Sequence, residues 1–495
     1  MSPVVLGKKF QKARELLGAG RYVEALSLYA TLIKEFPQGS IEYGSAAMQS
    51  GDLDLGNRIL EKVRSREPNN ATLLLKLAEI YGNGGLHAKY RALLSEAAGI
   101  EPGNLNLQIK LATVLTRTNS VEEARPAVSR CLELDPRNEL ARSLSAHLDR
   151  RENKLAEAEQ QFRKLLAAGL EQPQVRYSCY SELAQILDKT GRFGEAMKLL
   201  EEGKTFARQA LNLTANRKGF HQLHETLAAY AHSLPKNILE TWGKSFPPRE
   251  RSAVNSVTFL TGSSRSGTTL VEKILDAHPG VAACDESLAF GIIPQRVDVT
   301  APVIPAQRLN VSRELYVRNF ANVLGAPVTG KTLLDKNPSQ TVWLSAFLRA
   351  FPELRVLIAI RDPRDVIISL YFQDHRNTNY FTLEQLARHY ASVMDVWLAI
   401  REWEGLAWME TRYEDVVADM QKEGGRVTGF LGLEWDESQM RFYERNREKT
   451  VLSNNYSDVT QPVYKRAVGR WQAYERQLAP ILPMLEPYCQ KFGYA

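Results

Sequence analysis

The sequence predicts two kinds of structure in one chain: an array of paired helices, followed by an α/β domain with a mostly parallel sheet. Up to about residue 210, helical stretches recur with a regular period. After residue 255, short apolar runs that favour strands alternate with helical stretches, which is typical of a sheet covered by helices. A glycine-rich loop between one such strand and its helix indicates a binding site.

The composition is that of an ordinary globular protein. Of 495 residues, 44% are hydrophobic and 24% are charged, so the chain is long enough for two or three domains with ample cores. The net charge of +6 suits a modest anionic ligand and does not require nucleic acid. The four cysteines form no disulfide or zinc pattern. We find neither a membrane-spanning apolar run nor a secretory signal, and we therefore expect a cytoplasmic protein.

The helical half repeats with a period near 34 residues. The phrases Gly20–Ala25 and Gly191–Ala196 share the same order of glycine, arginine, an aromatic residue and Glu-Ala. We expect a proline to end a helical stretch in each unit. These prolines are Pro37, Pro68, Pro102, Pro136 and Pro173, with separations of 31 to 37 residues. A unit of two helices with this period is characteristic of tetratricopeptide (TPR) repeats.

The resemblance to TPR proteins covers about residues 5–210 and implies five or six units. Small residues that let paired helices approach closely are Ala25, Gly56, Ala124, Ala158 and Ala196. One unit cannot bury its apolar face alone, so we expect a stacked α-solenoid with a concave surface. Two interpretations of this array stay open: a spacer or homodimerisation arm, and a groove that binds a protein, a peptide or another acceptor.

We expect three parts: a TPR α-solenoid over 1–210, a helical linker over 211–250, and an α/β domain over 251–495. The proline-bearing stretch 246–251 marks the expected boundary. Within the α/β domain, the expected strands are 257–260, 331–334, 354–360 and 407–411. In open α/β sheets, ligands bind at the carboxyl ends of the strands, and the residues that follow each strand are therefore candidates for a site.

The loop after the first expected strand gives the strongest signal. Gly262 and Gly267 bracket Ser-Ser-Arg-Ser, and a helix is expected to begin at Thr268. The N–H groups of such a loop and the helix N-terminus attract an anion. The glycine spacing fits a Walker A loop, but Thr268 stands where the lysine for the β- and γ-phosphates belongs. We therefore expect an anion nearer to a monophosphate, with Arg265 as added charge. A P-loop kinase with Mg²⁺ on Asp362 is the alternative, and the missing lysine speaks against it.

A second anion site is expected after the third strand. Arg361 follows this strand directly, and Asp362 is a natural N-cap for the next helix. Ser369 lies two turns along that helix, and an arginine and a hydroxyl in this arrangement can hold a second phosphate. An ion pair between Arg361 and Asp365 is the structural alternative.

These two motifs together resemble the sulfotransferases, and above all the tyrosylprotein sulfotransferases and bacterial TPR-sulfotransferases. The matching segments are residues 264–270, 275–279, 285–286, 335–338, 412–415, 461–464 and 469–471. The resemblance covers about residues 255–475 and implies a P-loop-like sulfotransferase domain. It also implies 3′-phosphoadenosine 5′-phosphosulfate (PAPS) as cosubstrate, the desulfated PAP as product, and no metal.

The resemblance assigns the 5′-phosphosulfate to the first loop and the 3′-phosphate to the second site. Tyr413 matches a tyrosine near the adenosine. The residues assigned to the cofactor are Ser264, Arg265, Ser266, Gly267, Thr268, Thr269, Arg361, Ser369, Tyr413, Asn455, Tyr464 and Arg470.

Catalysis is assigned to three residues. Sulfuryl transfer needs a base for the acceptor hydroxyl and positive charge at the leaving oxygen, which cationic side chains can supply. By resemblance, Arg265 and Lys336 lie beside the bridging oxygen, and Glu286 takes the acceptor's proton. The alternatives are Asp285 as base, a helix-capping role for Glu286, and a surface position for Lys336. His278 is expected to have a structural role.

Two departures from the family pattern leave the acceptor open. Asn455 stands where the family often has a serine, and Leu288 stands where tyrosylprotein enzymes carry an arginine that reads acidic peptides. Peptide tyrosine, sugars, lipids and small phenols all stay open as acceptors. A TPR scaffold with an inactive enzyme domain is the other class of function, and the presence of the candidate residues together speaks against it.

Overall fold

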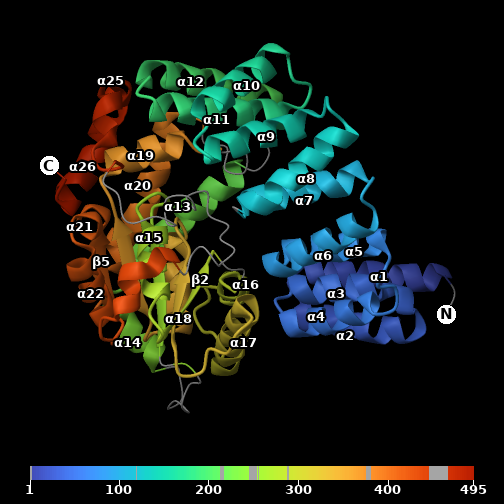
Figure 1. Cartoon of the computed structure of the whole chain (residues 1–495). Helices are drawn as coiled ribbons and strands as arrows, with labels where there is room; N and C mark the ends of the chain where they lie inside the picture. The colour runs from blue at the N-terminus through green and yellow to red at the C-terminus, as the bar shows by residue number, and fades with distance from the viewer. Residues whose placement is uncertain are drawn as a thin grey trace. The chain divides into compact units, whose positions relative to one another are not determined.

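The computed structural model describes residues 3–118, 120–211, 217–244, 254, 256–286, 289–374, 381–444 and 466–494 (Figure 1). The chain divides into two compact units. The first comprises Met1–Val114 with Ser287–Pro327, and the second comprises Leu115–Glu286 with Val328–Ala495. Each unit therefore combines part of the helical array with part of the α/β sequence. The boundaries expected at residues 210 and 250 stay a prediction.

The array consists of helical hairpins, as the period predicts. The hairpins are α1 (Pro3–Gly18) with α2 (Tyr22–Glu35), α3 (Ser40–Gln49) with α4 (Leu53–Arg64), α5 (Ala71–Asn83) with α6 (His87–Ile100), α7 (Leu105–Arg117) with α8 (Val121–Leu134), α9 (Glu139–Arg151) with α10 (Leu155–Ala167), and α11 (Pro173–Lys189) with α12 (Phe193–Ala210). From α5 onward the first helices start at residues 71, 105, 139 and 173, a spacing of 34. The expectation that each repeat proline ends a helix is wrong for Pro173, which begins α11 because its fixed φ suits a first turn.

The predicted small residues lie where paired helices meet. The four predicted alanines, at positions 25, 124, 158 and 196, have no exposed surface. A Cβ on Gly56 would lie 2.9 Å from Cγ of Met48. The turn inside a hairpin needs a left-handed residue, and Gly20, Gly51 and Gly191 have φ of +70°, +81° and +77°. Local packing therefore explains both the small residues and the glycines of the repeat.

In the first unit, α16 (Ile292–Arg296) and α17 (Ala306–Leu324) pack against the second hairpin. Asn319 Nδ2 donates a hydrogen bond of 2.6 Å to the carbonyl oxygen of Gly51. Arg318 Nε lies 3.0 Å from Asp54 Oδ2. The sequence analysis assigned these helices to the α/β domain; in the structure they form one compact unit with the first repeats.

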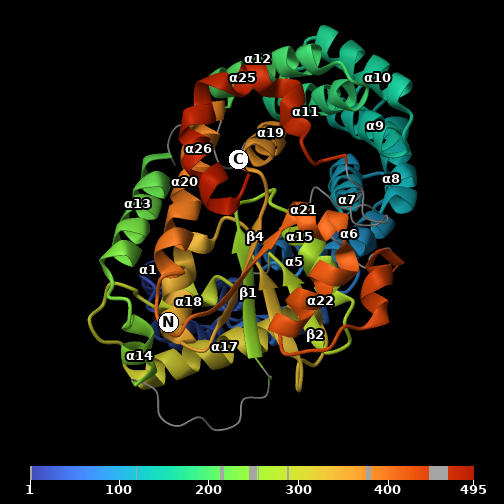
Figure 2. The same cartoon turned by 90° about the vertical axis from the view of Figure 1, so that its left-hand side faces the viewer.

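The second unit contains a five-stranded sheet in the order β2-β3-β1-β4-β5 (Figure 2). Its strands are β1 (Ser256–Gly262), β2 (Val281–Asp285), β3 (Thr332–Lys336), β4 (Arg355–Ile360) and β5 (Ala407–Arg412). All four neighbouring pairs among these strands are parallel. The predicted fold class is confirmed. The strand β2 is absent from the predicted strands, because its Val-Ala-Ala-Cys run contains few residues with strong β-propensity.

Helices cover both faces of this sheet. Alternate residues of a strand point to opposite faces. Leu260 joins a buried core with Leu270 and Ile274 of α15 (Thr268–Asp276). Phe259, one residue earlier, stacks on Phe347 of α18 (Leu344–Ala350), with ring centroids 4.9 Å apart. The strand ends are thereby fixed between two packed layers.

The remaining helices complete the second unit. They are α13 (Arg217–Ser233), α14 (Ile238–Gly243), α19 (Pro363–Tyr371), α20 (Leu383–Ile400), α21 (Tyr413–Ala418), α22 (Met420–Phe430), α25 (Glu475–Leu478) and α26 (Leu482–Phe492), with the short η3 (Thr341–Trp343), η4 (Glu437–Arg441), η5 (Arg470–Tyr474) and η6 (Ala479–Ile481). Within the described residues, every helix is too short or too polar to cross a membrane.

Gly51→Ala should destabilise the first unit more than Gly20→Ala does. Both changes force a side chain into left-handed backbone, at about 1–2 kcal/mol. A Cβ on Gly51 would also collide with Ile292 Cδ1 of α16, whereas a Cβ on Gly20 meets nothing within 4 Å. Thermal unfolding followed by circular dichroism should show the larger loss for Gly51→Ala. Equal losses would contradict the packing of α16 on this turn.

Lys204 of α12 is a buried lysine with an altered pKa. Its Nζ lies 3.3 Å from the carbonyl oxygen of Gln373 and 4.7 Å from the ring centroid of Tyr371. Burial lowers the pKa of Lys204 to about 7 from 10.5, although Asp374 acts in the opposite direction. Between these two pKa values the unfolded chain binds a proton that the native chain lacks. Stability contributed by this group therefore rises with pH through that window.

Lys204→Met should flatten this pH dependence. Methionine keeps much of the side-chain volume and removes the titrating group. In wild type, we expect this lysine to add up to about 1.4 kcal/mol of unfolding free energy per pH unit between pH 7 and 9. Urea unfolding at the two pH values measures the difference. Lys198→Met, on the exposed side of the same helix, is the control, and an unchanged slope in Lys204→Met would contradict the low pKa.

Candidate active site

The candidate site lies at the carboxyl ends of the strands. β3 and β4 flank β1 on opposite sides, so the loop after β1 lies at the switch point where ligands bind in open α/β sheets. Because the strands are parallel, the segments after them meet at one edge of the sheet. These segments carry the predicted residues Glu286, Arg361 and Tyr413, and Lys336 is the last residue of β3.

The loop after β1 has a constrained backbone. Gly262 has φ +124°, and a Cβ there would collide with the carbonyl oxygen of Ala359. Gly267, the N-cap of α15, has φ +92°, and a Cβ there would lie 2.7 Å from the ring of Tyr413. Arg265 adopts φ +73° although it has a side chain. Such strain costs about 1–3 kcal/mol and persists only where the surrounding structure holds it.

A serine that the sequence analysis missed holds this loop from the β3 side. Ser339 Oγ accepts a 3.0 Å hydrogen bond from the backbone N–H of Ser264, and its own N–H donates to the carbonyl oxygen of Gly262 at 2.7 Å. Ser339 also has φ +61°. Of the other predicted loop residues, Ser266 Oγ donates to the carbonyl oxygen of Ser263 at 2.6 Å. Ser264 and Ser266 therefore help to fix the shape of the loop.

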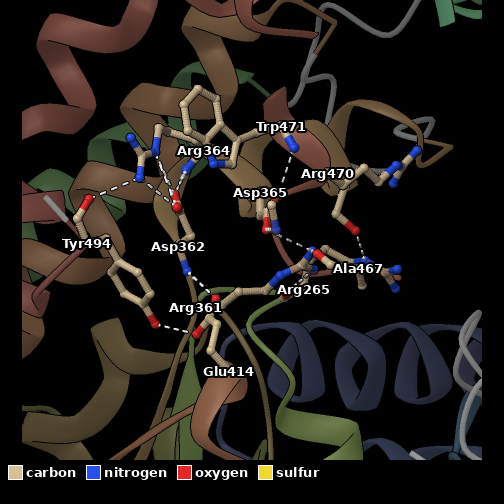
Figure 3. Close-up of polar contacts among 12 residues, drawn as sticks. Arg265, Arg361, Asp362, Arg364, Asp365, Glu414, Ala467, Arg470, Trp471 and Tyr494 are labelled. Atoms are coloured by element: carbon tan, nitrogen blue, oxygen red, sulfur yellow. Dashed lines mark hydrogen bonds and ion pairs between the residues drawn. The ribbon is translucent and has the colours of Figure 1, made fainter. Parts of the chain in front are cut away.

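The structure brings the two predicted anion sites together. Arg265 Nε donates a 2.8 Å hydrogen bond to Ser369 Oγ. Arg361 Nη1 donates to the carbonyl oxygen of Arg265 at 3.2 Å (Figure 3). The guanidinium of Arg361 lies 5.0 Å from the ring centroid of Tyr413. The loop after β1 thus lies in direct contact with Arg361 and Ser369, and the three form one candidate site.

The ion pair between Arg361 and Asp365, which is the structural alternative, is present, but it does not engage every nitrogen of the guanidinium. Asp365 Oδ2 lies 3.7 Å from Arg361 Nη2. Arg361 is 6% exposed, and its Nε is buried and has no hydrogen-bond partner among the residues that the structure describes. A buried unpaired N–H of a cation is costly, and an anionic ligand would relieve that cost.

The N-terminus of α19 is held by the end of the chain (Figure 3). Asp362 caps the helix as predicted, accepting from the backbone N–H of Arg364 at 2.9 Å, and it also pairs with that arginine's guanidinium at 2.8 Å. Tyr494 accepts from Arg364 Nη2 at 3.0 Å through its carbonyl oxygen and donates its hydroxyl to Glu414 at 2.6 Å. The carboxylate of Asp362 is therefore already engaged by protein groups.

Lys336 lies at the end of β3 and is fully buried. Its Nζ pairs with Asp285 and lies 3.2 Å from Glu286 Oε1. Burial acts to lower the pKa of Lys336, but the carboxylates of Asp285 and Glu286 more than offset it and raise the pKa above the usual value. The alternative of a surface lysine is wrong, and this lysine stays a cation.

Glu286 follows β2 directly and is open to solvent. Its side chain is 58% exposed, and its backbone, with φ +50°, donates a 2.8 Å hydrogen bond to the carbonyl oxygen of Lys336. The helix-capping alternative is wrong, since Gly291 is the N-cap of the next helix. Both Asp285 and Glu286 contact Lys336, so the choice between them as base stays a prediction.

A second ionic pair lies in α15, beneath this site. Glu272 and Lys273 are buried, with Oε2 and Nζ 2.9 Å apart. Burial raises the pKa of Glu272 to about 7, although Lys273 opposes the shift. No sequence pattern indicates this pair, because both residues lie within an ordinary helical pattern.

Other predicted residues lie elsewhere or outside the described residues. His278 is structural as expected, with Nε2 2.9 Å from the carbonyl oxygen of Glu434. Arg470 Nη2 lies 3.0 Å from Asp188 Oδ2 of α11, and its contact with a cofactor stays a prediction. The predicted residues outside the described part are Leu288, Asn455 and Tyr464. Within the described part, no group of three or more His, Cys, Asp or Glu is arranged to hold a metal ion.

Comparison with known proteins gives the class of this fold and site. Residues 258–437 match the sulfotransferase family, and residues 10–55 match the tetratricopeptide repeat. The chain thus carries a sulfotransferase-family domain behind TPR repeats, which confirms the resemblance that the sequence motifs indicated.

The similar proteins include a putative protein-tyrosine sulfotransferase of Caenorhabditis briggsae, 22% identical over 49% of this chain and 90% of that protein. The nodulation protein NoeE of Sinorhizobium fredii is 30% identical over 25% of this chain and 32% of that protein. An uncharacterized protein of Aquifex aeolicus is 23% identical over 63% of this chain, which is 42% of its own length. Among solved structures, the sulfotransferase domain of the Synechococcus PCC 7002 olefin synthase is 19% identical over 46% of this chain and 90% of that chain, with a TM-score of 0.34.

Proposed function

We propose that this chain transfers the sulfuryl group of PAPS to a hydroxyl group of an acceptor. The observation that carries the proposal is the meeting, at one sheet edge, of the loop after β1 with the ion pair between buried Lys336 and exposed Glu286. An anion-binding loop, a cation held in its charged form and an exposed carboxylate are the three groups that this reaction needs.

The residues present fit a nucleotide with two anionic groups. The loop from Gly262 to Gly267 offers backbone N–H groups and a helix N-terminus to one anion. Arg361, whose buried Nε is unpaired among the described residues, and Ser369 offer a cation and a hydroxyl to the other. When bound, PAPS supplies the sulfuryl group and leaves as PAP. Tyr413, beside both Gly267 and Arg361, is in position to contact the nucleoside.

The transfer then follows from the charges at the site. The acceptor oxygen forms a bond to sulfur as the bond between sulfur and the bridging phosphate oxygen breaks. Glu286 takes the acceptor's proton, and Lys336 and Arg265 offset the negative charge that develops on the leaving oxygen. Asp285 keeps Lys336 charged while Glu286 changes its protonation state.

The class of acceptor is a hydroxyl-bearing molecule, and peptide tyrosine is the one that the relatives' names favour. A kinase is disfavoured because Asp362, the carboxylate that would hold Mg²⁺, is engaged by Arg364. A scaffold with an inactive enzyme domain does not explain a fully buried lysine at the sheet edge. The four cysteines are free thiols, which supports the proposal of a reducing, cytoplasmic location.

Arg361→Ala should weaken PAP binding. It removes a charge-assisted contact worth roughly 1.5–3 kcal/mol, so the Kd should rise by roughly tenfold to more than a hundredfold. Calorimetric titration of PAP without added metal measures the change. Arg388→Ala is the control, because Arg388 is an exposed arginine paired with Glu384 on α20. An unchanged Kd in Arg361→Ala would remove this arginine from the site.

Glu286→Gln should lower turnover by roughly 10²–10⁴-fold, the usual share of general-base catalysis. Its PAP affinity should stay near that of wild type, because the carboxylate is exposed and faces the acceptor side. A phenol acceptor with strongly electron-withdrawing substituents should partly rescue Glu286→Gln, since its proton leaves more easily. It should not rescue Lys336→Met, whose defect lies at the leaving group.

The matched comparison for this experiment is Asp285→Asn, which changes the neighbouring carboxylate on the same lysine. If Glu286→Gln turns over normally and Asp285→Asn is dead, Asp285 is the base and the assignment to Glu286 is wrong. Steady-state kinetics with PAPS and a series of phenols distinguish the two.

A further inference from the structure

The last helical hairpin of the array contacts the segment that supports Arg361. This segment, residues 466–474, includes η5 and lies in the same compact unit as α11 and α12. We propose that Asp188, near the end of α11, is a positioning residue for the arginine that binds the cofactor's 3′-phosphate. The inference rests on the proposed function, because it names the 3′-phosphate subsite of the same site.

Asp188 holds the 466–474 segment through two side chains. Its Oδ2 lies 3.0 Å from Arg470 Nη2, and its Oδ1 accepts a hydrogen bond from the hydroxyl of Tyr474. The side chains of Asp188 and Arg470 are only 19% and 21% exposed. Removing one member of a largely buried pair leaves the other charge poorly solvated, so this contact constrains the segment strongly.

Aromatic packing fixes the same segment between the array and α19. The ring of Tyr474 makes an edge contact with Phe193 of α12, at a centroid distance of 5.5 Å. It also contacts Phe372, the C-cap residue of α19, at a centroid distance of 5.7 Å. The guanidinium of Arg470 lies 4.4 Å from the centroid of that phenylalanine. The hairpin and the helix of the second anion site thus share one set of contacts.

On its other side, the segment engages α19 through its backbone (Figure 3). Asp365 accepts from the N–H groups of Gly469 at 2.8 Å and Trp471 at 2.7 Å. Arg361 Nη2 donates to the carbonyl oxygen of Ala467. Asp365 has no exposed side-chain surface and is also the ion-pair partner of Arg361. The orientation of Arg361 therefore depends on where these backbone groups lie.

These contacts form a short physical path from the array to the predicted phosphate site. Asp188 fixes Arg470 and Tyr474, and these two residues fix the backbone of the 466–474 segment. Backbone N–H groups of this segment donate hydrogen bonds to Asp365, and one of its carbonyl oxygens accepts a hydrogen bond from Arg361 Nη2. The last hairpin of the array therefore orients the arginine that is proposed to bind the cofactor, in addition to packing against the α/β part of the same unit.

The test compares two nucleotides that differ only in the 3′-phosphate. Wild type should bind PAP more tightly than AMP, which lacks that group. Asp188→Asn keeps the shape of the side chain and removes its charge. We expect it to weaken PAP binding about tenfold and to change AMP binding by less than about twofold. Calorimetric titration of both nucleotides gives the ratio, which a merely structural loss would not alter.

Asp149→Asn is the matched control, because Asp149 is an aspartate of the same array that pairs with Arg125 at 2.9 Å. It should leave the PAP-to-AMP ratio unchanged. Tyr474→Phe removes only the hydroxyl whose hydrogen bond Asp188 accepts. It replaces Asp188→Asn in the test if that variant does not fold. We expect it to lower PAP affinity several-fold, with AMP affinity unaltered.

The outcomes separate the inference from the proposed function. If wild type prefers PAP and the ratio is the same in Asp188→Asn or Tyr474→Phe, the positioning role is wrong while the proposed function stands. An equal loss for both nucleotides would show a general disturbance and overturn the inference too. If wild type shows no preference for PAP over AMP, the 3′-phosphate subsite and this inference fail together.

Discussion

The candidate site depends on keeping one buried ammonium group charged. Lys336 has no exposed surface, and an unpaired charge at such a position would lose its proton or destabilise the fold. Asp285 prevents this. It is the Cα partner of Lys336 in the β2–β3 register, so strand pairing itself brings the carboxylate to the lysine. A shift of one residue in this register would turn the two side chains to opposite faces of the sheet.

Backbone strain is concentrated around the same lysine. Among the described residues, four that are not glycine have positive φ, and Arg265, Glu286 and Ser339 are three of them. Each follows a different strand of the sheet, and each is held by hydrogen bonds to a neighbouring strand, loop or helix. Since strained backbone persists only where surrounding contacts over-determine it, these residues mark where the fold gives up stability for a fixed arrangement of side chains.

The sequence predicted the features that depend on local pattern. Spacing and residue type alone indicate the 34-residue period and the loop from Gly262 to Gly267. They also indicate that Arg361 directly precedes a capped helix. The strand β2 was not predicted, because its small residues have a weak preference for strands. The contacts of Ser339 and Asp188 were not predicted for another reason. Their hydrogen-bond partners lie 75 and 282 residues away in the sequence, and no local pattern indicates a contact of that range.

The same reasoning bears on the role of the repeats. From the sequence, the array is interpreted either as a spacer or as a groove for a partner, because the repeat pattern indicates only how the repeats stack on each other. The structure adds contacts of a different kind. The first repeats share a compact unit with α16 and α17, and the last hairpin shares one with the sheet. Each unit therefore buries surface that neither sequence half could bury alone, and removing the repeats would expose that surface. The repeats of the second unit are thus part of the fold that supports the predicted catalytic residues.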